Sequence, residues 1–326
     1  GYRMRAEFRV WHLGGSWDYV MFDPQSRQRI VITDCQMVTD AIRQLMMPLR
    51  DLLLADTELS RRLFAVDFLA STTGEVLVTL IYHRPLDESW DASALALSQK
   101  LPERVMLLGR SRGKKRVLVR DYVEEMLTLP NQTQFKIRHV ENAFSQPNAK
   151  VNQQMLAWVA EVMASDSNIK DVLELYGGAG NFTWVLAQYA RSVVMTELSK
   201  QAVQSAQSAF AQANIQNVQV AAMDSEQVSG LLSVSGEGTN LRWQDKDYAF
   251  DVVLVDPPRA GLDDVTRALV QRFDRIIYIS CNPETLARDV QAWQSTHDVK
   301  AWAMFDQFPY THHIEMGMVF EKISKD

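Results

Sequence analysis

Cysteine is almost absent from this sequence, with only Cys35 and Cys281 among 326 residues. Two thiols are too few for a disulfide-stapled scaffold, for an iron–sulfur cluster or for a cysteine-based metal site. Scarce cysteine is typical of a reducing compartment, and with no signal-peptide pattern we expect a cytoplasmic protein. The chain opens at Gly1 rather than at methionine, already inside a strand-like pattern, so an upstream segment is expected to be missing.

Long apolar runs are also lacking. No run approaches the roughly 18 residues that a helix needs to cross a bilayer, so no membrane role is expected. Positive charge is not in excess either: the net charge is −6, which argues mildly against binding to nucleic acid. Basic residues are nevertheless segregated, because the segment from Arg104 to Arg120 contains no acid. Either a solvated basic hairpin or an RNA-binding surface fits that segment. The basic residues of this segment are Arg104, Arg110, Arg112, Lys114, Lys115, Arg116 and Arg120. A second basic group consists of Arg3, Arg5, Arg9, Arg27 and Arg29.

The N-terminal part of the chain is predicted to be a mixed α/β domain spanning residues 1–140. At this length the chain can hold two ordinary globular domains. Apolar and polar residues alternate from Tyr2 to Val10, which predicts a strand. Further strands are expected at 29–34, 63–69, 76–82, 105–109 and 116–120, and a helix is expected at 38–54.

Residues 141–326 are predicted to form a second domain, in which strands and helices alternate. Such alternation is typical of a doubly wound parallel sheet. The last two strands, at 299–305 and 317–322, are joined by an irregular loop, so the last strand should run antiparallel to the others. Strands are expected at 171–175, 192–196, 218–222, 250–255 and 275–280, and helices at 151–163, 201–213, 265–271 and 283–294.

A glycine-rich turn follows the first strand of this second domain. Glycine occupies three of the four positions from 177 to 180, which lets a ligand approach the backbone closely. Glu197 ends the next strand, where an acid can accept hydrogen bonds from ribose hydroxyls. These features fit any nucleoside cofactor. Two details favour S-adenosylmethionine over NAD: Glu174 precedes the glycines, and Thr183 replaces the third glycine of G-x-G-x-x-G.

Asp256 and the two prolines after it end the strand at 250–255. A D-P-P sequence in this place is a frequent mark of methyltransferases that act on nucleobases, and its prolines stiffen the loop. Enzymes that methylate exocyclic amines usually follow this motif with an aromatic residue that stacks on the flipped base. Here the next residue is Arg259, which argues against amine methylation.

Cys281 lies between the apolar strand at 275–280 and a helix that should begin at Pro283. Free backbone N–H groups at a helix N-terminus favour an anion, so we expect a lowered thiol pKa and a nucleophilic thiolate. A buried structural cysteine is the alternative. Glu315 precedes the antiparallel last strand, which places it at the same sheet edge as Asp256 and Cys281. Adjacent His312 and His313 usually diverge, so no metal site is expected.

A cysteine, a carboxylate and a methyl donor together indicate methylation of a pyrimidine at carbon 5. Addition of the Cys281 thiolate to carbon 6 makes carbon 5 nucleophilic enough to attack a sulfonium methyl group. Glu315 would then remove the carbon 5 proton so that the thiolate can leave. RNA cytosine-5 enzymes typically carry another cysteine in the D-P-P loop. None occurs there, which favours uracil.

With these residues in place, the chain closely resembles the tRNA (uracil-5-)-methyltransferase family. The matching segments are YRMRAEF (2–8), ENAFSQPN (141–148), LELYGGAGNF (173–182), VDPPRAGL (255–262), SCNPETL (280–286) and FDQFPYTHHIE (305–315). The resemblance implies a class I S-adenosylmethionine-dependent methyltransferase with a Rossmann-like sheet, preceded by an RNA-binding domain. It further implies binding to the T-arm of tRNA and conversion of the T-loop uridine to 5-methyluridine. We also expect a monomer. By the same resemblance, the residues that contact S-adenosylmethionine are Gln146, Tyr176, Asn181, Glu197 and Asp256.

Family members often carry cysteine where this chain has Gly177, a position with no nucleophilic role. Related ribosomal-RNA enzymes tend to have a cysteine cluster and an added RNA-binding domain, and this chain shows neither, which favours tRNA. Three alternatives stay open: a uracil-5 methyltransferase acting on ribosomal RNA, a non-catalytic RNA-binding or folding factor, and an NAD-linked oxidoreductase.

Overall fold

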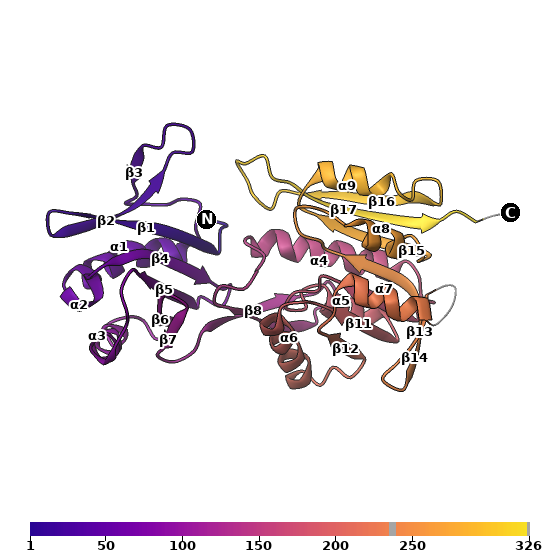
Figure 1. Cartoon of the computed structure of the whole chain (residues 1–326), viewed down its shortest axis with the longest axis horizontal. Helices are drawn as coiled ribbons and strands as arrows, with labels where there is room; N and C mark the ends of the chain where they lie inside the picture. The colour runs from indigo at the N-terminus through magenta and orange to yellow at the C-terminus, as the bar shows by residue number, and fades with distance from the viewer. Residues whose placement is uncertain (235–238, 325–326) are drawn as a thin grey trace. The chain divides into compact units, whose positions relative to one another are not determined.

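The computed structural model describes residues 1–234 and 239–324, which divide into two compact units (Figure 1). The first unit contains Gly1–Met126 and Arg138–Ala149, and the second contains Leu127–Ile137 and the chain from Lys150 onward. The hairpin of β8 (Tyr122–Thr128) and β9 (Gln134–Val140) is therefore divided, with its base in the first unit and its tip in the second. The functional boundary near residue 140 stays a prediction.

The first unit is built on a seven-stranded sheet in the order β3-β2-β1-β4-β5-β6-β7. Its strands are β1 (Arg5–Leu13), β2 (Ser16–Phe22), β3 (Arg29–Val31), β4 (Leu63–Ala70), β5 (Val76–Tyr82), β6 (Val105–Ser111) and β7 (Lys114–Val117). Neighbouring strands are antiparallel except β5 and β6, which are parallel and are joined through a helix. The predicted mixture of helices and strands is found, and its sheet is mainly antiparallel.

Helices α1 (Asp40–Leu54), α2 (Thr57–Ser60) and α3 (Glu88–Ser98) pack on one face of this sheet. Alternation in β1 sends Phe8 and Val10 into that core and turns Arg9 and Trp11 to the opposite face. We call the face opposite these helices the charged face. The strand predicted at 116–120 is wrong in its bounds, because positive φ angles at Arg112 (43°) and Gly113 (77°) close a tight turn. Pairing therefore resumes at Lys114.

The second unit contains an eight-stranded sheet whose main path is β12-β11-β10-β14-β15-β17-β16, with β13 paired to β14. Its strands are β10 (Asp171–Leu175), β11 (Ser192–Thr196), β12 (Val218–Ala221), β13 (Asn240–Trp243), β14 (Lys246–Val255), β15 (Arg275–Ser280), β16 (His297–Phe305) and β17 (Glu315–Lys322). The strands from β12 to β15 on the main path are parallel, and β17 runs antiparallel to β15, as predicted.

Helices cover both faces of the second sheet, which explains why its central strands are continuous apolar runs. The helices are α4 (Ala149–Ala164), α5 (Thr183–Tyr189), α6 (Lys200–Gln212), α7 (Ser225–Val234), α8 (Asp264–Val270) and α9 (Pro283–Val290). Met155 of α4 and Phe210 of α6 belong to the core on one face, whereas Leu269 of α8 and Leu286 of α9 belong to the core on the other. All functional groups of this unit must therefore reach solvent at the edges of the sheet.

Gly317 lets the last strand pack against α4. A Cβ atom at this position would lie 2.6 Å from the ring of Trp158, closer than real Cβ contacts allow. Because Gly317 pairs with Ile279 of β15, the Trp158 ring fits over the sheet in only one register of β17. That register fixes where Glu315 lies.

Candidate active site

Strand pairing brings Cys281 and Glu315 together. In the antiparallel ladder of β15 and β17, Ser280 lies opposite Met316. Cys281 and Glu315 are the chain neighbours of these two residues, both at the end of the ladder, and the carboxylate of Glu315 acts electrostatically on the thiol. The thiol is half-buried and Glu315 is only 6% exposed.

The environment of Cys281 raises its pKa instead of lowering it. Burial is the main cause, and the nearby carboxylates of Glu315 and Asp256 add to it, while the positive charge of Arg259 acts in the opposite direction. The expected activation by the helix N-terminus is therefore wrong for the protein without ligands. Burial and two carboxylates outweigh the dipole of a helix that is eight residues long.

Three carboxyl groups at this edge have raised pKa values. Burial raises the pKa of Glu315 to about 7 and that of Glu174 to about 8. Asp256 is raised well above its ordinary pKa by burial and by the charge of Glu315. Among the described residues, Glu174 Oε2 accepts a hydrogen bond from Thr183 while Oε1 has no partner. The edge thus gathers acids that can hold or release protons near neutral pH.

The turn around Cys281 is fixed by local hydrogen bonds. The backbone N–H of Asn282 donates to Ser280 Oγ (3.2 Å), and Asn282 Oδ1 caps α9 by accepting from the N–H of Glu284 (3.1 Å). Pro283 occupies the first helical turn, as predicted. Asn282 Nδ2 also donates to the carbonyl of Arg259 (3.2 Å), so the turn contacts the loop that follows Asp256.

A pocket lies at the carboxyl ends of β10, β11 and β12. Glu197 forms part of its wall and accepts hydrogen bonds from the backbone N–H groups of Gly178 (3.0 Å) and Ser199 (2.7 Å). The pocket is lined by Leu175, Tyr176, Thr196, Glu197, Leu198, Met223, Asp224, Ser225 and Asp263. Two of the five predicted cofactor contacts, Tyr176 and Glu197, are therefore in its lining.

The three other predicted cofactor contacts lie in different surroundings. Asn181 forms a reciprocal amide pair with Asn152 of α4 (2.9 and 2.8 Å), which orients its side chain and leaves one N–H and one lone pair for a ligand. Asp256 follows β14 directly. Gln146 belongs to the first unit, in the segment between β9 and α4.

The residues of this pocket fit a nucleoside cofactor. Gly178 has φ +57°, and a Cβ at this position would meet no described atom within 4 Å, so the turn backbone is open to a ligand. At Gly177, a Cβ would lie 2.4 Å from Met195 Cγ, so a larger residue here requires the Met195 side chain to move. Acids and apolar side chains line the same space, which suits ribose hydroxyls and a planar base.

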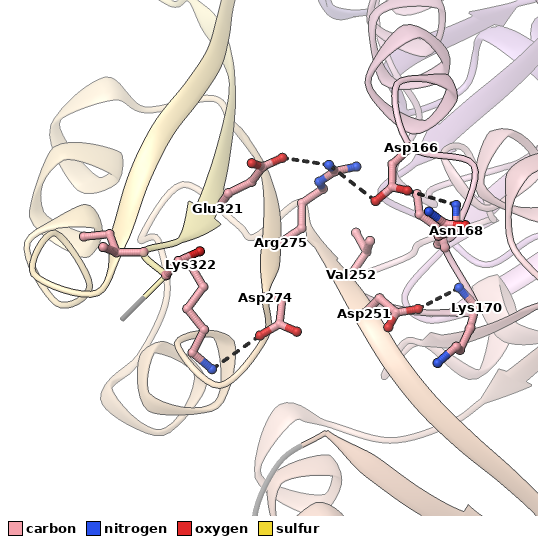
Figure 2. A pocket seen from close by; sticks show the side chains of 12 residues that line it. Asp166, Asn168, Lys170, Asp251, Val252, Asp274, Arg275, Glu321 and Lys322 are labelled. Carbon is pink, nitrogen blue, oxygen red and sulfur yellow. Dashed lines mark hydrogen bonds and ion pairs between the residues drawn. The ribbon is translucent and has the colours of Figure 1, made fainter. Parts of the chain in front are cut away.

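Another cavity lies at the opposite edge of the second sheet (Figure 2). Its charged side chains pair with one another: Arg275 contacts Glu321 at 2.7 Å, and Lys322 contacts Asp274 at 3.4 Å. Asp251 accepts from the backbone N–H of Lys170 at 2.6 Å. None of the predicted site residues lines this cavity. Its polar groups hold the amino ends of the strands together.

A stacked group that was not predicted lies on the charged face of the first unit. The guanidinium of Arg9 lies 4.1 Å from the centre of the Phe64 ring, and Phe64 stacks on His83 with centroids 3.8 Å apart. A bulge between Leu63 and Ala65 turns Phe64 out of an otherwise buried strand. Alternation predicted the direction of Arg9, but no sequence signal marked the bulge.

A second exposed aromatic group lies on the same face. Trp11 is 44% exposed, with Arg29 at 4.7 Å over its ring and Phe22 packed edge-on at 6.3 Å. Arg9 and Trp11 are two residues apart on β1, so both groups share one side of the sheet. Interleaved arginines and aromatic rings are typical of surfaces that bind single-stranded nucleic acid.

The basic segment at 104–120 is partly neutralised by acids from elsewhere in the chain. Arg110 makes two hydrogen bonds to the buried carboxylate of Glu141 (2.6 and 2.7 Å), and Lys115 pairs with Asp121 at 2.5 Å. Arg112 and Lys114 are exposed and form no ion pair within the described residues. Only part of the segment is therefore available to a ligand.

Within residues 1–234 and 239–324, no group of three or more histidine, cysteine, aspartate or glutamate side chains is arranged to hold a metal ion. None of the helices in that part of the chain is both long enough and apolar enough to cross a membrane.

Comparison with known proteins gives concordant matches. The family model described as tRNA (Uracil-5-)-methyltransferase matches residues 1–323. A protein of Idiomarina loihiensis named tRNA/tmRNA (uracil-C(5))-methyltransferase is 46% identical over 99% of this chain and 88% of its own length. One of the same name from Acinetobacter baylyi is 43% identical, over 99% and 90%.

Solved structures show the same fold. The structure of Pyrococcus abyssi tRNA (uracil-54, C5)-methyltransferase in complex with S-adenosyl-L-homocysteine matches with a TM-score of 0.73 and 20% identity, over 98% of this chain and 76% of that one. A putative S-adenosylmethionine-dependent methyltransferase from Streptococcus mutans matches with a TM-score of 0.53 and 11% identity, over 93% and 88%. The predicted fold class is confirmed.

Proposed function

The chain belongs to the tRNA (uracil-5-)-methyltransferase family, and we propose that it methylates carbon 5 of the T-loop uridine of tRNA through a covalent adduct with Cys281. The protein is an S-adenosylmethionine-dependent methyltransferase. The glycine-rich turn fits either S-adenosylmethionine or NAD. Membership of this family identifies S-adenosylmethionine as the cofactor. The names of the relatives include tmRNA, which is therefore a second candidate substrate.

One observation carries this proposal: the pairing of Ser280 with Met316, which brings their neighbours Cys281 and Glu315 to the carboxyl edge of the sheet. The pocket containing Glu197 opens at the same edge, since it lies at the carboxyl ends of neighbouring strands. A nucleophile, a base and a cofactor pocket at one sheet edge fit the chemistry that uracil-5 methylation needs.

The proposed reaction starts with the thiol of Cys281. It must lose its proton before the sulfur adds to carbon 6 of uracil, and Arg259 supplies the nearby positive charge that favours the thiolate. Addition makes carbon 5 nucleophilic. S-adenosylmethionine, held in the pocket with Tyr176 and Glu197, would supply an electrophilic methyl group on sulfur for carbon 5, with S-adenosylhomocysteine as the leaving group.

Glu315 completes the reaction. Its carboxylate takes the proton from carbon 5, the double bond between carbons 5 and 6 forms again, and the bond to the Cys281 sulfur breaks. A base with a pKa near 7 suits this step, because it is partly ionised at neutral pH and still basic enough to accept a proton. Activity should rise with pH through this range.

The cofactor contacts are proposed in two groups. Glu197 would accept hydrogen bonds from the ribose hydroxyls, and Tyr176 would form part of the wall beside the nucleoside. The remaining proposed contacts, Gln146, Asn181 and Asp256, would bind the methionine part of the cofactor or the transferring end of the molecule.

RNA would bind to the charged face of the first unit. Loop bases are already unpaired, so they can stack on protein rings at little cost, and Arg9, Phe64 and His83 offer such a stack. Trp11 and Arg29 extend the same surface. A T-arm hairpin fits these requirements because its loop presents unpaired bases next to a rigid stem.

The direct test is mass spectrometry of nucleosides from unmodified transcripts incubated with the protein and S-adenosylmethionine. We expect 5-methyluridine at one T-loop position of tRNA, and no product with Cys281→Ala. Transcripts of tmRNA and ribosomal RNA should be run in competition. Preferential methylation of ribosomal RNA would overturn the substrate assignment, and product formation by the cysteine variant would overturn the mechanism.

A further inference from the structure

Asp289 is a fully buried carboxylate on α9, the helix that begins just after Cys281. Its Oδ2 accepts hydrogen bonds from the backbone N–H of Leu262 (2.7 Å) and from the hydroxyl of Tyr278 (2.7 Å). Its Oδ1 accepts from two guanidinium groups, Arg267 Nη1 at 3.0 Å and Arg288 Nε and Nη2 at 2.9 and 2.6 Å. Both oxygens are therefore fully used inside the protein.

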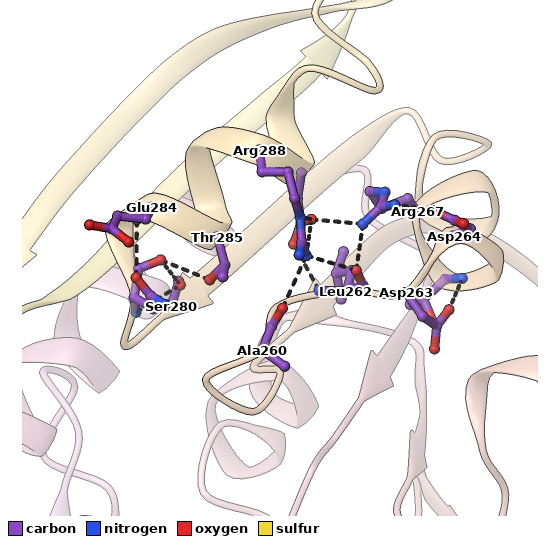
Figure 3. Close-up of polar contacts among 12 residues, drawn as sticks. Ala260, Leu262, Asp263, Asp264, Arg267, Ser280, Glu284, Thr285 and Arg288 are labelled. Atoms are coloured by element: carbon purple, nitrogen blue, oxygen red, sulfur yellow. Dashed lines mark hydrogen bonds and ion pairs between the residues drawn. The ribbon is translucent and has the colours of Figure 1, made fainter.

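The same contacts hold the loop that follows Asp256. Nη2 of Arg288 donates to the carbonyls of Ala260 and Leu262 (both 3.0 Å), and Arg267 also donates to Leu262 (2.6 Å) (Figure 3). At the start of the loop, the carbonyl of Arg259 accepts from Asn282 Nδ2 (3.2 Å) and Thr285 Oγ1 (3.4 Å). The loop is thus fastened to α9 at both ends.

Gly261 shows how tightly the loop approaches this carboxylate. Its φ is +75°, and a Cβ atom there would lie 2.6 Å from Asp289 Oδ2 and 2.8 Å from Arg288 Nη2. Any side chain at this position would therefore push the loop away from α9.

We propose that Asp289 is a positioning residue for methyl transfer: it fixes the loop carrying Arg259 to the helix behind Cys281, so that the positive charge stays beside the thiol. The inference rests on the proposed role of Cys281 as nucleophile.

The charges around Cys281 explain why this position matters. The facing charged groups are Glu315 from β17, Asp256 after β14 and Arg259 in the loop, and of these only Arg259 favours the thiolate. The side chain of Arg259 is exposed and makes no ion pair within the described residues, so its place depends on the backbone of the loop. Release of the loop would leave two carboxylates facing the thiol, and the thiol pKa would rise further.

The test compares Asp289→Asn with Asp171→Asn. Asp171 is an equally buried carboxylate of the same unit, bonded to Arg191 (3.0 Å) and to the backbone N–H of Ala249 (2.7 Å), but it begins β10 at the far end of the strands. Both variants lose a buried charge that pairs with arginine. Only Asp289→Asn should change the chemistry of Cys281.

The first readout needs no cofactor and no RNA. In a Cys35→Ser background, the rate of alkylation of Cys281 by iodoacetamide is measured against pH, because only the thiolate reacts. We expect Asp289→Asn to shift this titration to higher pH, and Asp171→Asn to leave it in place. The second readout is methylation, where Asp289→Asn should lower kcat by about 10- to 100-fold with the KM for RNA unchanged.

Gly261→Ala keeps the proposal testable if Asp289→Asn folds poorly. It leaves every charge in place but displaces the loop, so the same shift in the alkylation profile is expected. Unchanged alkylation profiles and kcat in both variants would overturn the proposal and leave Asp289 with a purely stabilising role. The role of Cys281 is judged separately, by whether Cys281→Ala abolishes product in the wild-type background.

Discussion

The two sheets of this protein expose their functional groups in opposite ways. The second sheet is covered by helices on both faces, and at its edge the thiol of Cys281 is half-buried and the carboxyl group of Glu315 is buried. The first sheet carries helices on one face, and the other presents Arg9 and Trp11 to solvent. Charged groups that are buried act strongly on their neighbours, whereas exposed groups act almost independently.

This difference sets the expected size of each substitution. Charges at the buried edge shift one another's pKa values, so removing one group changes the whole site. On the charged face, several arginines and rings repeat the same kind of contact, so the loss of one should weaken RNA binding without stopping the reaction.

The largest effect is expected from Cys281→Ala, which removes the nucleophile. Transfer of labelled methyl groups to tRNA should fall on the order of 10³-fold or more, because no other group can form the covalent adduct. Cys35→Ala is the matched control, since Cys35 belongs to the first unit and packs against its core. Equal activities of the two variants would mean that both thiols are merely structural.

Glu315→Gln should trap the reaction after methyl transfer. Without a base, the carbon 5 proton stays, the double bond cannot form again, and the bond between RNA and Cys281 persists. A denaturing gel should show a protein band carrying labelled methyl and RNA. Absence of that band, with normal RNA binding, would assign the base to another residue.

The same substitution should stabilise the folded protein at alkaline pH. Burial raises the pKa of Glu315 from 4.5 to about 7, so the folded state holds its proton more tightly than the unfolded state. Ionised Glu315 therefore destabilises the protein, and this penalty grows between pH 4.5 and 7 to about 3 kcal/mol. Denaturant unfolding at pH 8 should find Glu315→Gln more stable than the wild type, with the difference vanishing near pH 4. A constant difference across that range would contradict the raised pKa.

Disruption of the stacked group should weaken RNA binding by a smaller factor. Phe64→Ala should raise the Kd for a T-arm hairpin about tenfold, because the Phe64 ring holds Arg9 and His83 in place and one base stacked on such a group contributes roughly 1–3 kcal/mol. Arg9→Gln should also lower the slope of log Kd against log salt by about 1, and Phe64→Ala should leave that slope unchanged. Leu95→Ala, at an exposed position on α3, is the control. Equal binding by all three variants would move the RNA surface away from this face.

The smallest effect on RNA binding is expected from substitutions in the basic hairpin. They also distinguish basic side chains without an ion pair from those that form one. Arg112→Gln with Lys114→Gln should weaken RNA binding a few-fold and lower the salt slope by up to about 2. Arg110→Gln should instead lower the free energy of unfolding, because it leaves the buried carboxylate of Glu141 with Lys115, at 3.7 Å, as its remaining cationic partner. The Kd for RNA and the free energy of unfolding should be measured for both variants. If Arg110→Gln weakened RNA binding without lowering the free energy of unfolding, the whole hairpin would be an RNA-binding surface.

Most of the second unit could be predicted from the sequence. Its strands at 171–175, 192–196 and 275–280 are apolar runs bounded by clear turn and helix signals, and their predicted bounds agree with the structure. The antiparallel direction of β17 could be predicted from the short connection before it. That direction also predicted that Glu315 lies at the same edge of the sheet as Cys281. These features depend on local pattern and topology, which a sequence displays directly.

Other features depend on contacts between distant residues and were missed or mistaken. The helix N-terminus after Cys281 suggested a lowered pKa, but the opposing carboxylates come from other strands. The ion pair of Arg110 with Glu141 joins residues that the sequence separates, so the basic segment looked more available than it is. The outward turn of Phe64 requires a bulge that is defined only by pairing with β5.

Gly317 has a consequence for how this protein can change in evolution. The Trp158 ring occupies the space that a side chain at position 317 would need. Gly317 is also part of the strand register that positions Glu315. Positions 158 and 317 should therefore vary together among relatives, with an aromatic ring at one only where the other is glycine.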